Sequence, residues 1–438
     1  MQQKTKIACW LAVLMAGSSM AAQAQGYKDG RLWLNSDGTQ YLKMTATVQV
    51  WARHTWLNPG SAINGFHKAQ YSDIGIRRLR MQLYGQVARR IFFYTQFGQN
   101  NFNFLADRKQ GFFVHDALGE YELLPGHMSI GMGLTGWSGL SRFASPAIGS
   151  LAGLDAPLFE QTTNDVTDQF LRKLSVYSKG KWGRLDYRLV LSQPLAVQKS
   201  AGYIAQPGSH ASFAAQPPHP LTQAYCMWQL LDKEADVLPY TTGTYLGSKR
   251  VFNIGAGFQY QPRAMWLRKG NDTSYTAMAN WAVDVYYDAP LAGKNGSAIS
   301  AYASFTRLQF GQGYLRNSAP MNMANGGSTG YLNGPGNGYP AYGSGQVWYA
   351  QLAWLLPINT VAHGQLMPYA SCQHAQYDAL DKEMNYYDAG INWLLSGHQG
   401  KFTLAYQDRP IYKTTTEGNG QRQTRHGALV LQYQVFLN

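Results

Sequence analysis

Strict alternation of apolar and polar side chains along many segments is the feature that most limits how this 438-residue chain can fold. Leu79, Met81 and Leu83 share one parity, whereas Arg78 and Arg80 occupy the other. Successive side chains of a strand point to opposite faces, so this pattern predicts a strand with one apolar and one wet face. We expect further strands of the same kind at residues 182–191, 252–260, 281–287, 299–305, 387–395 and 429–437.

The length and the ends of these segments suit a membrane. A tilted strand needs roughly 9–11 residues to cross a bilayer, and many of the segments begin or end at Tyr or Trp, as the aromatic girdles of a barrel require. We therefore predict an all-β chain that forms a transmembrane antiparallel β-barrel of about 16 strands. A soluble sandwich or solenoid also alternates and is the main alternative.

The composition favours the barrel over the soluble alternative. Charged residues make up 14% of the chain and aromatic residues 13%, whereas a typical soluble domain has about 25% charged residues. The mean hydropathy of −0.31 is nevertheless polar. An apolar face opposed to a neutral-polar face reconciles these values, and a transmembrane barrel has both faces.

The N-terminus has the layout of an export signal. Lys4 and Lys6 precede an apolar stretch at residues 7–17, and Ala22 and Ala24 form a small-residue cleavage motif. The apolar stretch is shorter than the roughly 20 residues of a spanning helix, which disfavours a membrane anchor. We expect a signal peptide at residues 1–24 and a barrel at residues 25–438, localised to the outer membrane of a Gram-negative bacterium.

The net charge indicates which partners to expect. It is +13 for the whole chain, and removal of Lys4 and Lys6 from the 37 basic residues leaves 35 minus 24, or +11. Export argues against nucleic acid as a partner, and the basic residues recur along strands, where a lumen would place them. We expect outer-membrane lipid and small hydrophilic or anionic solutes as partners, and no cofactor.

Two cysteines remain after the predicted cleavage. Cys226 and Cys372 could form one disulfide in an oxidising periplasm or stay as two buried thiols, and the sequence does not decide between these states. Neither cysteine lies at metal-ligand spacing, so we expect no metal site.

The predicted connections alternate in length. Short ones lie at residues 88–91, 179–182 and 397–400, and long polar ones at residues 192–220 and 311–345. Short turns at one rim and long loops at the other are typical of outer-membrane barrels.

Residues 136–169 differ from the other long connections. They carry Phe143, Leu151, Leu154 and Phe159, and a merely solvated loop rarely has so many apolar side chains. We expect this segment to fold back into the lumen as a constriction loop, with one side packed on the wall. A partly structured surface loop is the alternative.

Several motifs resemble the phosphate-selective porins O and P. They are the arginine-rich run at residues 76–85, the strand at 116–121, the long segment after residues 131–133, and the closing motifs at 390–393 and 401–404. This resemblance implies a 16-stranded homotrimeric barrel, a third loop that forms the constriction inside the lumen, and a ladder of basic residues that guides anions.

The resemblance also implies roles for individual cations. Arg78 and Arg80 match the wall arginines that face the constricting loop, and alternation independently places both on the polar face. For the others, the alternative is a position at the membrane rim, where long basic side chains reach the headgroups. The further candidates on polar parities are Arg53, Lys173, Arg184, Arg188 and Lys401.

The predicted constriction loop departs from the phosphate-selective pattern. Arg142 is its single basic residue, and we count it among the candidate lumen cations. A basic wall opposite an acidic loop would set a transverse field, so we predict general diffusion of small hydrophilic molecules with mild anion preference rather than specific phosphate binding. The acids of this loop are Asp155, Glu160, Asp165 and Asp168.

Enzymatic barrels and partner-docking barrels are the competing classes. No Gly-x-Ser-x-Gly motif occurs, since residues 139–143 fail at the last position. His54, His115, His127, His363 and His374 have no companion at triad or metal spacing. We therefore predict no catalytic residues; catalytic groups assembled from distant strands are the alternative.

Overall fold

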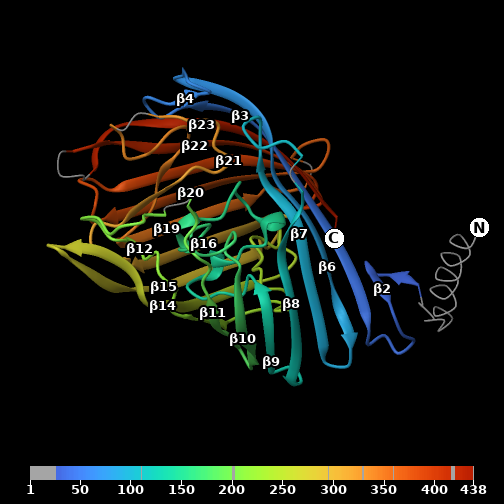
Figure 1. Cartoon of the computed structure of the whole chain (residues 1–438). Helices are drawn as coiled ribbons and strands as arrows, with labels where there is room; N and C mark the ends of the chain where they lie inside the picture. The colour runs from blue at the N-terminus through green and yellow to red at the C-terminus, as the bar shows by residue number, and fades with distance from the viewer. Residues whose placement is uncertain are drawn as a thin grey trace, which may run out of the picture.

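The structure is a closed antiparallel barrel. The computed structural model describes residues 26–109, 111–199, 203–293, 295–327, 330–358, 360–415 and 420–437, so the predicted signal peptide lies outside the described residues. Within these ranges, sixteen strands form the wall, each pairs with the next along the chain, and the last pairs with the first (Figure 1). The predicted fold class and the strand number of about 16 are confirmed.

The wall strands follow one another in chain order. They are β3 (Tyr41–Trp56), β6 (Gln70–Ala88), β7 (Ile91–Phe102), β8 (Phe113–Leu124), β9 (Met128–Thr135), β10 (Lys173–Trp182), β11 (Leu185–Gln193), β13 (Leu221–Gln229), β14 (Val251–Lys269), β15 (Asp272–Pro290), β16 (Ala298–Leu308), β19 (Gly345–Leu355), β20 (Gln365–Tyr377), β21 (Met384–Ser396), β22 (Gly400–Thr414) and β23 (Gly420–Leu437). Short strands outside the wall are β1 (Tyr27–Lys28), β2 (Arg31–Trp33), β4 (Ala62–Ile63), β5 (Phe66–His67), β12 (Ser212–Phe213), β17 (Leu315–Ser318) and β18 (Tyr339–Gly343).

The wall presents an apolar outer face. On β11, Leu189 and Leu191 are about half exposed, whereas Arg188 between its outward neighbours is buried inside. On β15, Trp281 and Val283 face outward in the same way. Soluble proteins rarely expose apolar patches of this extent, whereas the outer band of a membrane barrel consists of them. No helix among the described residues is long and apolar enough to cross a membrane.

The two rims of the barrel differ. We call the end that holds the start of β3 and the end of β23 the turn rim; its connections at residues 89–90, 125–127, 183–184 and 397–399 are short. The opposite end, the loop rim, holds the long connections 136–172 and 309–344. The short connection expected at residues 179–182 is wrong, because β10 continues to Trp182 and the chain turns at 183–184. Residues 230–250 are an unexpected long connection at the turn rim.

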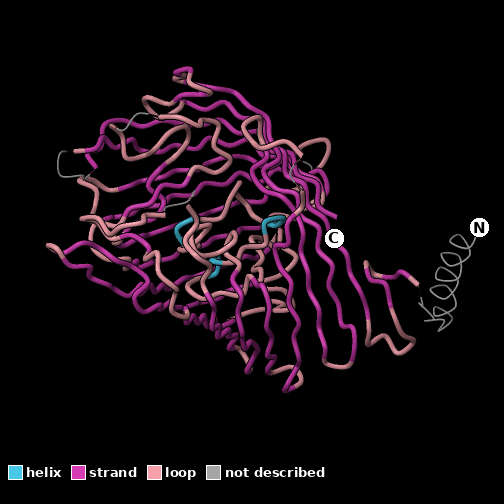
Figure 2. The backbone as a smooth tube through the Cα atoms, in the orientation of Figure 1, coloured by secondary structure: helices cyan, strands magenta, loops and turns pink. Residues whose placement is uncertain are grey.

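The constriction loop, residues 136–172, lies inside the barrel as predicted. Its short helical turns η1 (Arg142–Ala144), η2 (Ile148–Ser150) and η3 (Leu158–Glu160) lie within the ring of strands (Figure 2). The backbone of this loop accepts hydrogen bonds from wall strands on different sides of the lumen. Lys401 Nζ donates to Leu151 O at 2.7 Å, and Gln259 Nε2 donates to Gly139 O at 3.3 Å. Since β22 and β14 lie far apart around the barrel, the loop crosses the lumen.

Candidate functional site

A cavity of about 890 Å³ lies in the lumen between the constriction loop and the wall formed by β3, β6 and β7. Its lining includes Lys43 near the start of β3 and Phe436 near the end of β23, both close to the turn rim. The same lining includes Ser318 and Pro320 of the outer loop, residues 309–344, which enters from the loop rim. We call this cavity the passage, because residues from both rims line it.

The lining of the passage is strongly basic. Asp165 is the single carboxylate among its described lining residues. Like charges along a narrow, partly desolvated channel raise the local concentration of counter-ions. The eight Lys and Arg residues of the lining are Arg31, Lys43, Arg77, Arg78, Arg80, Arg172, Lys249 and Arg316.

A bulge in β6 brings two consecutive arginines into the lumen. Gln49 of β3 pairs with Arg78 and Val50 pairs with Ile76, so Arg77 is the extra residue of β6. A bulge of this kind rotates the strand by one side-chain position. Without it, Arg77 would face lipid, where an arginine near the bilayer centre costs about 2–4 kcal/mol.

Both arginines bind one carboxylate of the constriction loop. Arg77 Nη2 lies 3.1 Å from Asp155 Oδ1 and from Oδ2, and Arg78 Nη2 also donates to Oδ1. Arg78 Nη1 donates to Gln49 Oε1 at 2.9 Å. Burial opposes ionisation of Asp155, but the two guanidinium groups lower its pKa below the ordinary value. Asp155 is therefore ionised and neutralises one of the two positive charges.

Arg80 and Arg172 differ in how their charge is compensated. Arg80 donates to the carbonyls of Leu79 and Gln99, each at 3.0 Å, so its acceptors in the described structure are neutral. Arg172 Nε lies 3.2 Å from Asp116 Oδ2, which forms a buried ion pair. Arg80 therefore contributes a full positive charge to the passage, whereas Asp116 offsets that of Arg172.

Four of the predicted lumen cations face the interior of the barrel but do not line the passage. Other groups cover them, and each contacts a carboxylate or donates to a backbone carbonyl of an inward-folded segment. Arg53 binds Asp73 at 2.7 Å, Lys173 lies 3.4 Å from Asp168, Arg188 Nη1 donates to Pro239 O at 3.3 Å, and Lys401 Nζ donates to Leu151 O at 2.7 Å.

Two further predicted cations lie elsewhere. Arg184 does not belong to a strand; it is exposed in the two-residue turn at the turn rim and donates to Gln229 O at 3.0 Å. Arg142 is fully buried against Glu234 and does not line the passage. The predictions for both residues are wrong. Arg184 was assigned to a strand because the turn was expected at residues 179–182, and the sequence of the loop does not show that Arg142 pairs with Glu234.

The four acids of the constriction loop do not form one face opposite the basic wall. Asp155 meets the wall and Asp165 lines the passage. Glu160 instead accepts hydrogen bonds from Tyr302 and other groups on the far side, with Tyr302 Oη at 2.9 Å from Oε1. Asp168 accepts from Thr163 inside the loop and lies 3.4 Å from Lys173 at the start of β10, which is outside the passage. The predicted transverse field between an acidic loop and a basic wall is therefore replaced by a passage of net positive charge.

Some lining cations were missed although the sequence signals two of them. Lys43 shares the parity of Arg53 on β3 and falls on the lumen face. Alternation places Arg77 on the lipid face of its strand, where an arginine is costly. A bulge that turns this side chain into the lumen removes the cost, so the position of Arg77 in the sequence indicates a bulge. Arg31, Lys249 and Arg316 lie outside the wall strands, where alternation gives no information.

Neither a disulfide nor a metal site occurs in the part of the chain that the structure describes. Cys226 and Cys372 are free thiols on different strands, so they form no disulfide. The expected burial is wrong, because Cys226 is exposed and Cys372 is partly buried. No three His, Cys, Asp or Glu residues of the described ranges are grouped so that they could hold a metal ion.

Comparison with solved structures identifies the fold. Pseudomonas putida OprB is 8% identical and superposes with a TM-score of 0.52 over 90% of this chain and 94% of that one. The fold is that of a porin barrel. The outer membrane channel DcaP of Acinetobacter baumannii (12% identity, TM-score 0.46, 91% of this chain and 99% of that one) and a mutant of Rh. blastica porin (8%, 0.44, 90% and 100%) are also similar.

The likeness to the porin structures has no counterpart in sequence. No protein-family model and no curated protein sequence matches the chain. At such low identities the likeness to the porin structures concerns the fold alone. The resemblance to the phosphate-selective porins O and P stays a prediction.

Proposed function

We propose that the protein is an outer-membrane porin whose passage lets small hydrophilic solutes diffuse passively, with a preference for anions. The observation that carries this proposal is a cavity that residues of both rims line, with eight Lys or Arg residues and one carboxylate among the described lining residues. A net positive lining attracts anions and repels cations without requiring a specific binding site.

The wall supports the proposed location. Its apolar outer face suits the hydrocarbon layer, and outer-membrane barrels place short turns in the periplasm and long loops outside. The turn rim would then face the periplasm and the loop rim the exterior. The predicted signal peptide agrees with export along this route. We further propose a homotrimer, as the resemblance implies, and the mass of the detergent-extracted complex tests that assembly.

Selective phosphate binding is not part of the proposal. Asp155 neutralises part of the charge of Arg77 and Arg78, and Asp116 offsets that of Arg172. The remaining lining cations come from different elements: Arg80 belongs to β6, Lys43 to β3 and Arg316 to the outer loop. We expect added phosphate to carry current in proportion to its share of the anions and not to block chloride current.

Planar-bilayer recording of the purified protein tests the proposal. We expect stable conductance steps and a reversal potential that is shifted toward anions under a salt gradient. Arg78→Gln and Arg80→Gln should each weaken this shift, because both residues line the passage. Arg184→Gln is the matched control, since this guanidinium group lies in a rim turn.

Two outcomes would contradict the proposal. Absence of conductance from correctly folded protein would reject the open channel, and hydrolysis of lipid or peptide by such a barrel would favour an enzyme instead. A conducting channel whose reversal potential is indifferent to Arg78 and Arg80 would reject the role of the basic lining. In that case the anion preference would have to come from elsewhere.

A further inference from the structure

The long connection at the turn rim folds into the lumen and pairs with the constriction loop. We call this connection, residues 230–250, the turn-rim segment. Thr241 N donates to Ser145 O at 2.9 Å, and Ala147 N donates to Thr241 O at 2.9 Å. Pro146 and Thr241 thereby form a parallel β-bridge. Two segments that enter from opposite rims are thus joined inside the barrel through backbone hydrogen bonds.

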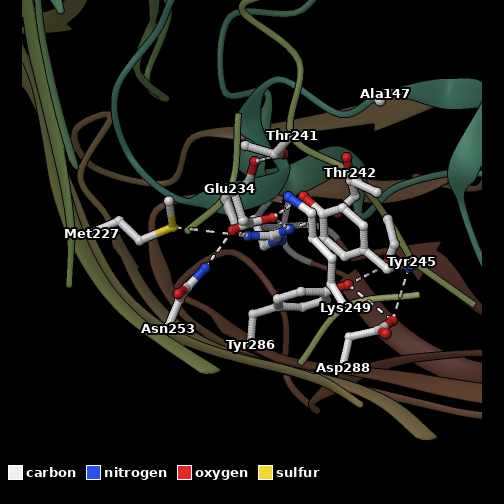
Figure 3. Close-up of polar contacts among 12 residues, drawn as sticks. Ala147, Met227, Glu234, Thr241, Thr242, Tyr245, Lys249, Asn253, Tyr286 and Asp288 are labelled. Carbon is white, nitrogen blue, oxygen red and sulfur yellow. Dashed lines mark hydrogen bonds and ion pairs between the residues drawn. The ribbon is translucent and has the colours of Figure 1, made fainter. Parts of the chain in front are cut away.

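A buried ion pair fastens the two segments to each other. Arg142 Nη1 lies 2.7 Å from Glu234 Oε2, and Arg142 Nη2 lies 2.6 Å from Glu234 Oε1. The side chains of Arg142 and Glu234 are 0% and 6% exposed. Figure 3 shows that Tyr245 and Asn253 also point toward Glu234, whose carboxylate accepts a hydrogen bond from each. Arg142 and Glu234 thus form two parallel charge-assisted hydrogen bonds, an arrangement that is stronger and more directional than a single hydrogen bond.

Further contacts hold the Arg142 side chain and backbone in place, among them a hydrogen bond from Arg142 N to Asp284 Oδ2 of β15 at 2.9 Å. Arg142 Nη2 also donates to Thr242 O at 2.7 Å, and Thr241 Oγ1 donates to Arg142 O at 2.6 Å. The ring of Tyr286 lies 3.6 Å from the guanidinium carbon. Burial opposes ionisation of Glu234, but the charge and hydrogen bonds of Arg142 lower its pKa below the ordinary value. The pair therefore stays ionised and acts as a fixed link.

The two segments also approach more closely than a side chain would permit. Gly243 N donates to Ser150 Oγ at 2.9 Å. A Cβ atom on Gly243 would lie 2.6 Å from Ser150 O and 2.7 Å from Leu151 Cα, which are backbone atoms. Glycine is the residue that allows such contact between two backbones.

The turn-rim segment also contacts the solute path directly. Tyr240, Tyr245 and Lys249 all line the passage. Displacement of this segment would therefore change the lining itself and, through Arg142, the position of the constriction loop.

We propose that the turn-rim segment is the second half of the constriction, and that the pair Arg142–Glu234 is a positioning contact through which it holds the constriction loop in place. This inference rests on the proposed diffusion function. Arg142, which the sequence predicted to be a lumen cation, is in this proposal an anchor of the constriction loop. The width of the passage is then set by segments from both the turn rim and the loop rim.

Two variants test the proposal by independent routes. Glu234→Gln removes the charge of the anchor, and Gly243→Ala separates the two backbones without any change of charge. In planar bilayers we expect each variant to increase the frequency of subconductance transitions at least about tenfold. In Glu234→Gln the reason is that removal of one partner of a buried ion pair is strongly destabilising. In Gly243→Ala the reason is that the new Cβ would lie 2.6 Å from Ser150 O and push the two backbones apart. Gly243→Ala should leave the sign of the reversal potential unchanged.

Asp73→Asn is the matched control. Asp73 forms an equally buried bidentate pair with Arg53 that joins β3 to β6. Arg53 also donates to Pro320 O and Met321 O of the outer loop, so the pair contacts that loop and not the constriction loop. We expect this variant to show subconductance transitions as rarely as the wild type. Trypsin cleavage after Arg142 in the folded barrel, read by mass spectrometry, gives a second measurement that does not need conductance and should rise about tenfold in Glu234→Gln.

The outcomes separate this inference from the proposed function. A wild-type barrel that does not conduct overturns the channel function. The positioning role alone is overturned if the wild type conducts and folded Glu234→Gln protein behaves like Asp73→Asn. That result would be the same low frequency of subconductance transitions and the same resistance to trypsin in both variants. If Gly243→Ala does not fold, the two measurements on Glu234→Gln decide.

Discussion

The charge balance at the constriction leads to a quantitative prediction for Asp155→Asn. Asp155 is the carboxylate that Arg77 and Arg78 share, and its removal leaves both arginines uncompensated at the edge of the passage. One added unit of positive charge acting at about 8 Å in water is worth about 0.5 kcal/mol to a passing monovalent ion. That free energy favours an anion about 2.4-fold and disfavours a cation by the same factor. We therefore expect the anion-to-cation permeability ratio to rise about sixfold.

Reversal potentials under a salt gradient near 0.1 M measure this ratio, and the effect should shrink at 1 M salt, where the screening length falls to about 3 Å. Arg78→Gln should change the ratio in the opposite direction by a similar factor. Asp272→Asn removes the same charge from an exposed position at the start of β15 that does not line the passage, and should change the ratio little. A ratio that falls or stays constant in Asp155→Asn, or that rises equally in Asp272→Asn, would contradict the predicted effect of this charge on permeation.

Three further predictions concern the loop, the thiols and the wall. Burial raises the pKa of Glu160 to about 7 from the ordinary 4.5, so the loop loses up to about 3 kcal/mol of stability as the pH rises between these values. Protease cleavage of the loop should increase over this pH range in the wild type and stay constant in Glu160→Gln. Cys226 and Cys372 should both take up a maleimide in detergent without prior reduction, which intact-mass measurement shows as two added labels; a disulfide would give none. Gly98→Ala should reduce the folded fraction on an unheated gel, because its Cβ would lie 1.9 Å from Leu79 O; a normal folded fraction would contradict this.

The inward-folded segments explain why the wall alone does not define the pore. Within regular strands, alternation identifies the side chains that face the interior of the barrel, among them Lys401 and Arg188. The constriction loop covers Lys401, and the turn-rim segment covers Arg188. The passage is therefore narrower and more one-sided than the barrel that encloses it, and it follows β3, β6 and β7.

The barrel and part of its charge pattern were predictable from the sequence by itself. The two-residue period of a strand follows from local backbone geometry, so the alternation around Arg78 and Arg80 predicts both a wet face and its residues. The apolar side chains of residues 136–169, such as Phe143 and Phe159, likewise predict a loop that must be buried, because water disfavours their exposure.

The contacts between distant segments were decided by the tertiary structure alone. Nothing local to Arg142 indicates that Glu234, 92 residues further along the chain, will neutralise it. The bulge at Arg77 depends on its register with β3, and the cover over Lys401 depends on where the constriction loop comes to lie. A strand pattern determines which side of a wall a residue faces, but the packing of loops inside the lumen determines whether that residue meets water, because those contacts join parts of the chain that no local period relates.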